Sequence, residues 1–183
     1  MAAPMLCNGS CVMLKSFGLL LLFLMMGSLV AVASPFIQQR VPQGKTVGQG
    51  ILSFVFWDVY QATLYAPQGQ WDPKGPFALS LEYYRDLKGA DIAQRSIEEM
   101  KKQGFNEIAT LAEWEKQMRA IFPDVKKGSV LSAVYSPEQG TSFYDGETPI
   151  GTIAGRAFAQ QFFGIWLAET TSEPDLRQAL LGL

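Results

Sequence analysis

Hydrophobic and polar positions divide the chain after residue 40 into segments with strand-like or helix-like spacing. Residues 51–65 are β-branched and aromatic on both faces, which predicts one central strand covered on both sides. Residues 77–85 alternate between apolar and polar, and this places four side chains on one face: Phe77, Leu79, Leu81 and Tyr83. A further strand is predicted at 130–135, and a hairpin over 141–153 around Asp145-Gly146.

Two pairs of predicted helices separate and follow these strands. In the first pair, one helix has Asp91 as its N-cap and ends at Gly104, and the next is capped by Asn106 and stopped by Pro123. In the second pair, Ser172-Glu-Pro-Asp175 opens the last helix, and the helix before it passes through Phe158, Phe162 and Ile165. This order predicts an α+β fold, in which an antiparallel sheet carries its helices on one face.

The N-terminal segment has the three parts of a secretory signal. Lys15 is the only charge among the first 39 residues, an apolar run covers 17–33, and Ala31-Val-Ala33 offers a small-x-small cleavage site. We therefore expect a signal peptide at 1–33 and an exported domain at 34–183, which is periplasmic or secreted. The alternative is an uncleaved anchor, which is the one route to a membrane that this sequence predicts. Met13 is an alternative start to Met1, because it gives a signal of more usual proportions.

Composition and charge exclude several classes of function. The chain has no histidine, which removes Ser-His-Asp and Cys-His catalysis and histidine metal sites. Both cysteines, Cys7 and Cys11, precede the apolar run and would leave with the signal. The net charge of −2 lacks the basic excess of a nucleic-acid-binding protein. We expect no metal, no cofactor and no nucleic-acid partner, and the sequence leaves the oligomeric state open.

Five motifs in order resemble the bacterial branch of the chalcone isomerase-like family, over about residues 40–183. They are Gly50 to Tyr65, Pro76-Phe-Ala-Leu-Ser-Leu-Glu-Tyr-Tyr-Arg-Asp86, Phe122-Pro-Asp-Val-Lys-Lys-Gly128, Phe143-Tyr-Asp-Gly146 and Phe163-Gly-Ile-Trp-Leu167 with Leu176-Arg177. The resemblance implies an open-faced β-sandwich, in which a large antiparallel sheet is layered by helices. Known relatives include plant flavonoid cyclases and non-catalytic proteins that bind fatty acids.

The resemblance does not carry over the family's catalytic residues. It places the family's catalytic arginine near Leu52 or Ser53, its catalytic tyrosine near Ile92 and an asparagine near Glu99. Cyclisation of a chalcone needs hydrogen-bond donors for the phenolate and the developing enolate, and Leu and Ile supply none. We therefore expect no catalytic residue of this kind in the chain and no chalcone isomerase activity.

Arg85 is the candidate residue for binding the carboxylate of a ligand. It continues the strand face that ends in Tyr83, so its guanidinium would grip a carboxylate at the mouth of an apolar pocket. The alternative is a local ion pair with Asp86 or Asp91. Four aromatic side chains are candidates to line a ligand cavity, with core packing as the alternative for each: Tyr60, Tyr83, Trp114 and Trp166. The charges at 98–102 are interpreted as a solvated helix face.

Three functions remain open on the sequence alone. The first is an exported, non-catalytic domain that binds a small apolar ligand such as a fatty acid. The second is an isomerase or intramolecular lyase of the same fold with a rewired site. The third is a structural or interaction protein with a filled core. A similar fold does not decide between them.

Overall fold

The computed structural model describes residues 35–183. The predicted signal peptide, its cleavage site at Ala33 and the alternative start at Met13 lie outside the described residues. The helices within that range are α1 (Pro35–Arg40), α2 (Gly89–Lys102), α3 (Ile108–Ile121), α4 (Arg156–Leu167) and α5 (Pro174–Leu181). None of these helices is long and apolar enough to cross a membrane.

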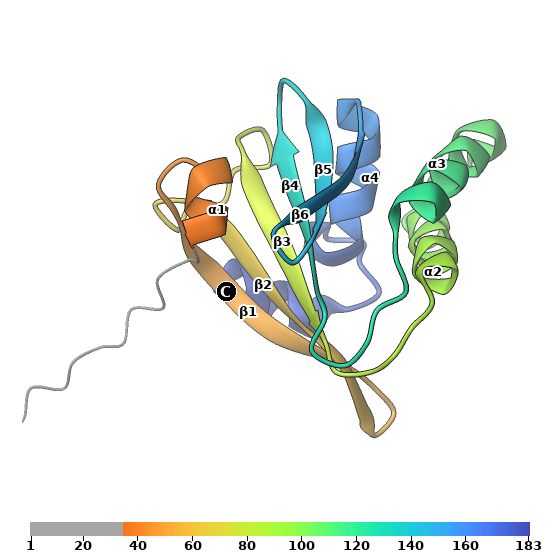
Figure 1. Ribbon diagram of the computed structural model, residues 1–183, viewed down its shortest axis with the longest axis horizontal. Helices are drawn as coiled ribbons and strands as arrows, with labels where there is room; N and C mark the ends of the chain where they lie inside the picture. The colour runs from red at the N-terminus through yellow and green to blue at the C-terminus, as the bar shows by residue number, and fades with distance from the viewer. Residues whose placement is uncertain (1–34) are drawn as a thin grey trace, which may run out of the picture. The chain divides into compact units, whose positions relative to one another are not determined.

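Six antiparallel strands form one open sheet in the order β1-β2-β3-β4-β5-β6 (Figure 1). The strands are β1 (Gly44–Phe54), β2 (Trp57–Pro67), β3 (Phe77–Tyr83), β4 (Val130–Ser136), β5 (Gly140–Asp145) and β6 (Thr148–Ile153). Each strand pairs with its neighbour in sequence, and β1 and β6 are the two edges. The predicted α+β class and the antiparallel sheet layered by helices are confirmed.

The prediction of one central strand over 51–65 is wrong. These residues belong to two strands, β1 and β2, which pair with each other up to Phe54 opposite Trp57. Val55 and Phe56 form the two-residue turn between them, and both are exposed. Because this turn has neither Gly nor Asn, the apolar run passes through it without the usual sequence signal.

The alternation predicted in β3 sorts the two faces of the sheet correctly. Phe77, Leu79, Leu81 and Tyr83 are all buried on one face, here called the inner face. Their neighbours in the adjacent strands continue this face, and together with helices α2 to α5 they form the main hydrophobic core. The other face is covered in part by α1, which the sequence did not predict.

Helix α1 packs on the outer face of the sheet in a small second core. Phe36 and Ile37 of α1 are buried with Ala78 of β3 and Val134 of β4. The guanidinium of Arg40 lies over the Phe36 ring, 4.0 Å from its centroid. The helices are therefore not confined to one face, although four of the five are on the inner face.

Two predicted helix caps are also wrong. The N-cap of α2 is Lys88, and the side chain of Asp124 accepts a hydrogen bond of 2.9 Å from the Gly89 N–H, so Asp91 lies inside the first turn. The N-cap of α3 is Glu107, while the Asn106 side chain donates to the Gly104 carbonyl oxygen instead. A cap supplied from a distant loop leaves no local sequence signal.

Helix α5 lies unusually close to the edge strand β1. A β-carbon added at Gly48 would overlap the carbonyl oxygen of Ala179, and one added at Gly50 would meet the Leu176 side chain at 2.7 Å. Only glycine permits this approach at the two positions. The contact fixes α5, and with it the preceding loop that reaches the candidate site.

Candidate functional site

A pocket of about 410 Å³ lies between the inner face of the sheet and helices α2 and α4. Strands β1 to β5 contribute its floor, and the loop before α5 contributes part of its rim. Its apolar lining includes Leu52, Val59, Leu79, Leu81, Leu87, Ile92, Phe122, Leu131, Ala133, Phe143, Phe162 and Ile165. Its polar lining includes Ser53, Tyr60, Asp91, Arg95, Ser96, Glu99, Ser172 and Glu173. The pocket is therefore mainly apolar.

Tyr60 joins the sheet to α4 at the polar side of the pocket. Its hydroxyl oxygen accepts a hydrogen bond of 2.9 Å from the indole N–H of Trp166. Because the Tyr60 oxygen acts as acceptor there, its own proton is left to be donated to a ligand. Burial raises the pKa of Tyr60 far above its ordinary value, although the Trp166 bond opposes this rise. The phenol is therefore a neutral hydrogen-bond donor at physiological pH.

Tyr83 lies beside Tyr60 on the next strand. The two rings meet edge to face with centroids 5.7 Å apart. Burial, with a smaller contribution from Tyr60, raises the pKa of Tyr83 as well. Two neutral phenols therefore stand side by side where the apolar floor meets the polar rim.

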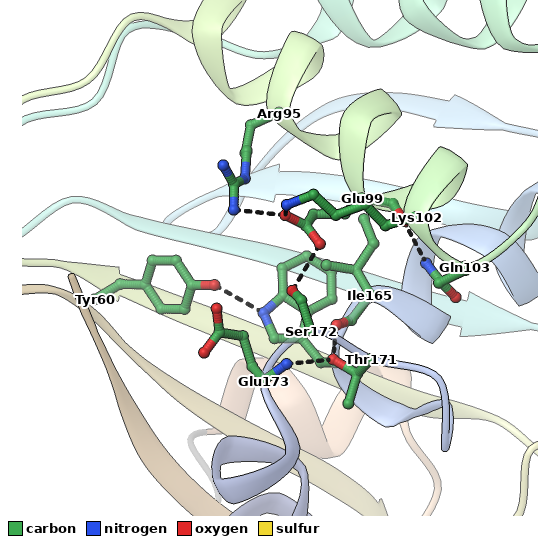
Figure 2. A network of polar contacts seen from close by, with 10 residues as sticks. Tyr60, Arg95, Glu99, Lys102, Gln103, Ile165, Thr171, Ser172 and Glu173 are labelled. Carbon is green, nitrogen blue, oxygen red and sulfur yellow. Dashed lines mark hydrogen bonds and ion pairs between the residues drawn. The ribbon is translucent and has the colours of Figure 1, made fainter. Parts of the chain in front are cut away.

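Glu99 of α2 is the centre of a polar network on the opposite wall (Figure 2). Its carboxylate pairs with Arg95 at 2.5 Å and Lys102 at 2.9 Å, and it accepts a hydrogen bond of 2.7 Å from the Ser172 hydroxyl. The residue is only 5% exposed. Burial alone would raise the pKa of Glu99, but Ser172, Lys102 and Arg95 outweigh it and hold the pKa below its ordinary value.

The loop before α5 brings Ser172 and Glu173 to the pocket. The Thr171 hydroxyl donates to the Ile165 carbonyl oxygen at 2.6 Å and accepts from the Glu173 N–H at 3.2 Å. Figure 2 shows the Glu173 carboxylate turned toward the Tyr60 hydroxyl. Burial and the nearby Glu99 charge raise the pKa of Glu173, although cations of α2 oppose this. A carboxyl in this position takes up a proton more readily than a solvated one.

Three of the five predicted site residues meet at this pocket: Tyr60, Tyr83 and Trp166 line it. Trp114 lies on α3 and is outside the lining, where it stacks on Phe105 with ring centroids 5.0 Å apart. Arg85 is exposed and also outside the lining. Strand β3 ends at Tyr83, so the alternation that predicted an inward Arg85 stops before that residue.

Arg85 instead contacts the edge of the β1–β2 hairpin. Its guanidinium carbon lies 5.8 Å from the centroid of the Trp57 ring. Asp86, its expected local partner, accepts a hydrogen bond of 3.0 Å from the backbone N–H of Lys127. The structure therefore brings Arg85 to an exposed aromatic ring and does not bring it to the pocket.

The cation that lines the pocket is Arg95, which the sequence reasoning missed together with Ser172 and Glu173. The interpretation of Glu99 as part of a solvated helix face is wrong, because this residue is buried. Helical spacing offers a signal for it: Ile92, Arg95 or Ser96, and Glu99 recur at intervals of three or four and share one face of α2. Nothing in the sequence links that face to the loop before α5.

The positions that the family resemblance assigns to catalysis also line this pocket. They are Leu52, Ser53, Ile92 and Glu99. The pocket therefore lies where the resemblance places the family's reactive site, and its residues there are mostly unable to donate a hydrogen bond. Within residues 35–183, no cluster of three or more acidic side chains could hold a metal ion.

Comparisons with known proteins agree with this geometry. The model of the chalcone isomerase-like family matches residues 45–182. An uncharacterised protein of Haemophilus influenzae is 27% identical over 154 residues, which cover 84% of this chain and 75% of that protein. A solved structure of a fatty-acid binding protein from Arabidopsis thaliana superposes with a TM-score of 0.59 and 12% identity, covering 76% of this chain and 87% of the other. That likeness shows a common fold.

Proposed function

The chain belongs to the chalcone isomerase-like family, and from that premise we propose that its pocket binds a single-chain apolar ligand such as a fatty acid. The observation that carries the proposal is a largely apolar pocket with a small set of hydrogen-bonding and charged groups in its lining. This is the usual form of a small-molecule site, in which apolar surface supplies affinity and a few polar groups fix orientation. The fatty-acid binding protein of the same fold supports the choice of ligand class.

The pocket has room for a medium-length hydrocarbon chain. Its volume of about 410 Å³ lies within the range of about 300–1,000 Å³ that is usual for ligand sites. A methylene group fills roughly the volume of a water molecule, about 30 Å³, so the space suits roughly a dozen heavy atoms. Leu79, Ala133 and Phe143 of three adjacent strands lie deep enough in the core to hold the chain's far end.

The head group of the ligand would lie among Arg95, Tyr60 and Glu173. The side chain of Arg95 is 58% exposed, and its partner Glu99 is held independently by Lys102 and Ser172. Arg95 is thus able to turn to a ligand carboxylate without leaving Glu99 unpaired. Tyr60 would donate its hydroxyl proton, and Glu173, whose pKa is raised, would take up a proton as the anionic ligand arrives.

A binding role without catalysis fits the pocket better than the two alternatives. The positions aligned with the family's catalytic arginine and tyrosine hold Leu or Ser and Ile, so the guanidinium and the phenol that would stabilise a chalcone's developing charge from these positions are missing. A rewired isomerase would have to use Tyr60, whose raised pKa keeps the phenol protonated at neutral pH, so its phenolate is not available as a base. A protein with a filled core would not leave a space of about 410 Å³.

Binding of an acid and of its matching alcohol tests the proposal. We expect delipidated protein to bind dodecanoic acid, and Arg95→Gln to weaken that binding about ten- to hundred-fold while leaving dodecanol nearly unchanged. The matched control is Arg119→Gln, since Arg119 forms the same i,i+4 pair with a glutamate at 2.7 Å on the exposed face of α3. Equal losses for acid and alcohol would assign Arg95 to the fold, and no binding of either ligand would refute the proposal.

We also propose that the domain acts after export. The lone N-terminal charge, the apolar run and the Ala31-Val-Ala33 site support this. N-terminal sequencing of the protein recovered from an expressing bacterium should give a chain that begins near Ser34. A mature chain that still begins at Met1 or Met13 would contradict cleavage.

A further inference from the structure

The tip of the β1–β2 hairpin exposes four consecutive large apolar side chains. They are Phe54, Val55, Phe56 and Trp57, with exposed fractions of 69%, 70%, 91% and 64%. Pairing of β2 with β3 begins only at Tyr60, opposite Tyr83, so the hairpin extends past the end of the neighbouring strand (Figure 1). Exposed apolar groups that lie together in this way mark an interaction site far more often than single ones do.

The turn at this tip has a conformation that an apolar residue does not favour. Val55 has a φ of +58°, and the first position of such two-residue turns normally holds Gly or Asn. A β-branched residue at positive φ is strained, so Val at this position costs stability that Gly would not. Ser53 and Asp58 close the base of the tip with a hydrogen bond of 2.6 Å. The hairpin thus holds its apolar tip in place at a cost to the fold.

The tip is continuous with the mouth of the ligand pocket. Phe54 belongs to the tip and also lines the pocket, next to Leu52 and Ser53. On the other side, the guanidinium of Arg85 lies over the Trp57 ring. A Trp ring and an Arg guanidinium together are suited to the boundary between hydrocarbon and lipid head groups.

The size and charge of this surface favour a lipid membrane over a protein partner. Four such side chains expose roughly 500 Å², whereas a stable protein interface needs about 800 Å² on each partner. Insertion into a membrane needs no complementary surface, and a projecting tip of Phe and Trp supplies the required chemistry. Exposed charges of both signs flank the tip, since Asp58 follows Trp57 in the sequence and the guanidinium of Arg85 lies over the Trp57 ring. Attraction to anionic lipid is therefore not required.

We propose that residues Phe54–Trp57 form a membrane-insertion tip, which docks the mouth of the pocket on a lipid surface. The proposal that the tip docks on a membrane depends only on the exposed side chains of the hairpin. The use of this docking, exchange of the apolar ligand between membrane and pocket, rests on the proposed function. A ligand that leaves the pocket past Phe54 would then enter lipid without crossing water, which removes the largest cost of its transfer.

Quenching of tryptophan emission by vesicles of brominated phosphatidylcholine tests the docking. Of the four tryptophans, Trp57 is 64% exposed, Trp71 is half-buried, and Trp114 and Trp166 are 8% and 6% exposed, so quenching reports mainly on Trp57. We expect saturable quenching with a shift of emission to the blue. Phe56→Ser should weaken partitioning about ten- to hundred-fold, the range for burial of one aromatic side chain. The matched control is Ile108→Ser, because Ile108 is 82% exposed on α3; it should leave partitioning unchanged.

Three outcomes would overturn the proposal. They are no quenching of the unaltered protein, an equal loss from Ile108→Ser, and a concentration-dependent dimer in light scattering that Phe56→Ser converts to a monomer. Binding of dodecanoic acid without vesicles separates the two proposals, since Phe56→Ser should bind the acid as the unaltered protein does. Acid binding without vesicle binding refutes the docking alone, and vesicle binding without acid binding refutes the pocket's function alone.

Discussion

Replacement of Glu99 by Gln removes one buried charge and almost nothing else from the wall of the pocket. The side chain keeps its shape, but it loses its ion pairs with Arg95 and Lys102, and its hydrogen bond from Ser172 becomes one between neutral groups. The two cations have side chains that are 58% and 54% exposed, so water solvates them once Glu99 is gone. The variant therefore leaves no unpaired buried charge.

The size of the loss follows from these three contacts. Each pair with a half-exposed cation contributes about 0.2–1 kcal/mol. A hydrogen bond to a charged group contributes about 1.5–3 kcal/mol, and one between neutral groups contributes about 1 kcal/mol. We expect the free energy of unfolding to fall by about 1.5–3 kcal/mol at neutral pH. For a domain of this size, that lowers the melting temperature by about 2–4 °C per kcal/mol.

The pH dependence of this loss distinguishes the charge from packing. The pKa of Glu99 is lowered in the folded chain, so its stabilisation is present above the unfolded value of 4.5 and is lost as pH falls through the folded value. Urea unfolding at neutral pH and in acid measures both limits. The matched control is Glu98→Gln, the same change at the exposed neighbouring residue, whose carboxylate accepts only from Gln94 in the described contacts. A loss that persists in acid, or an equal loss from Glu98→Gln, would show that the Glu99 charge is not the source of the stabilisation.

Three further predictions concern the edge strand, the loop before α5 and catalysis. Gly48→Ala should lower the free energy of unfolding by about 1–3 kcal/mol or more, because the new methyl group overlaps the backbone of Ala179. The control is Gly75→Ala, where the nearest atom lies 3.7 Å from the added β-carbon; it should change the melting temperature little. Glu173→Gln should stabilise the fold at neutral pH and have no effect in acid. The pKa of Glu173 is raised in the folded chain, so its carboxylate lowers the free energy of unfolding as pH rises above the pKa of the unfolded chain. Urea unfolding of both proteins across this pH range measures the difference. Absorbance assays with a standard chalcone should show a rate near background, because loss of one preorganised donor alone costs about 10²–10³ in rate. Turnover like that of a plant-type enzyme would contradict the last prediction.

Most of the fold could be read from the sequence, because its signals there are local. The alternation of apolar and polar residues in β3 predicted which side chains face the core. Helical spacing, with Gly and Pro at the boundaries, predicted α2 and α3. The hairpin between β1 and β2 was missed because Val55 and Phe56 carry no turn signal. Its turn is set by pairing across the two strands, which outweighs local preference.

Only part of the candidate site could be predicted from the sequence, because only its apolar segments carry a periodic signal. Tyr60, Tyr83 and Trp166 belong to apolar segments whose inward direction follows from periodicity. Arg95 and Glu173 are charged residues that ordinarily face solvent. They reach the pocket through tertiary packing of α2 and α5, which no short-range pattern encodes. Arg85 failed to reach it because β3 ends two residues earlier.

Calorimetric titration of delipidated protein with dodecanoic acid measures directly whether the pocket binds a fatty acid. We expect one saturable site per chain, which Ala133→Phe blocks because Ala133 lines the pocket and the added ring fills part of it. Circular dichroism and a melting curve would confirm that this variant is folded. Absence of saturable binding, or binding that the folded Ala133→Phe variant leaves unchanged, would contradict the claim that this pocket holds the ligand.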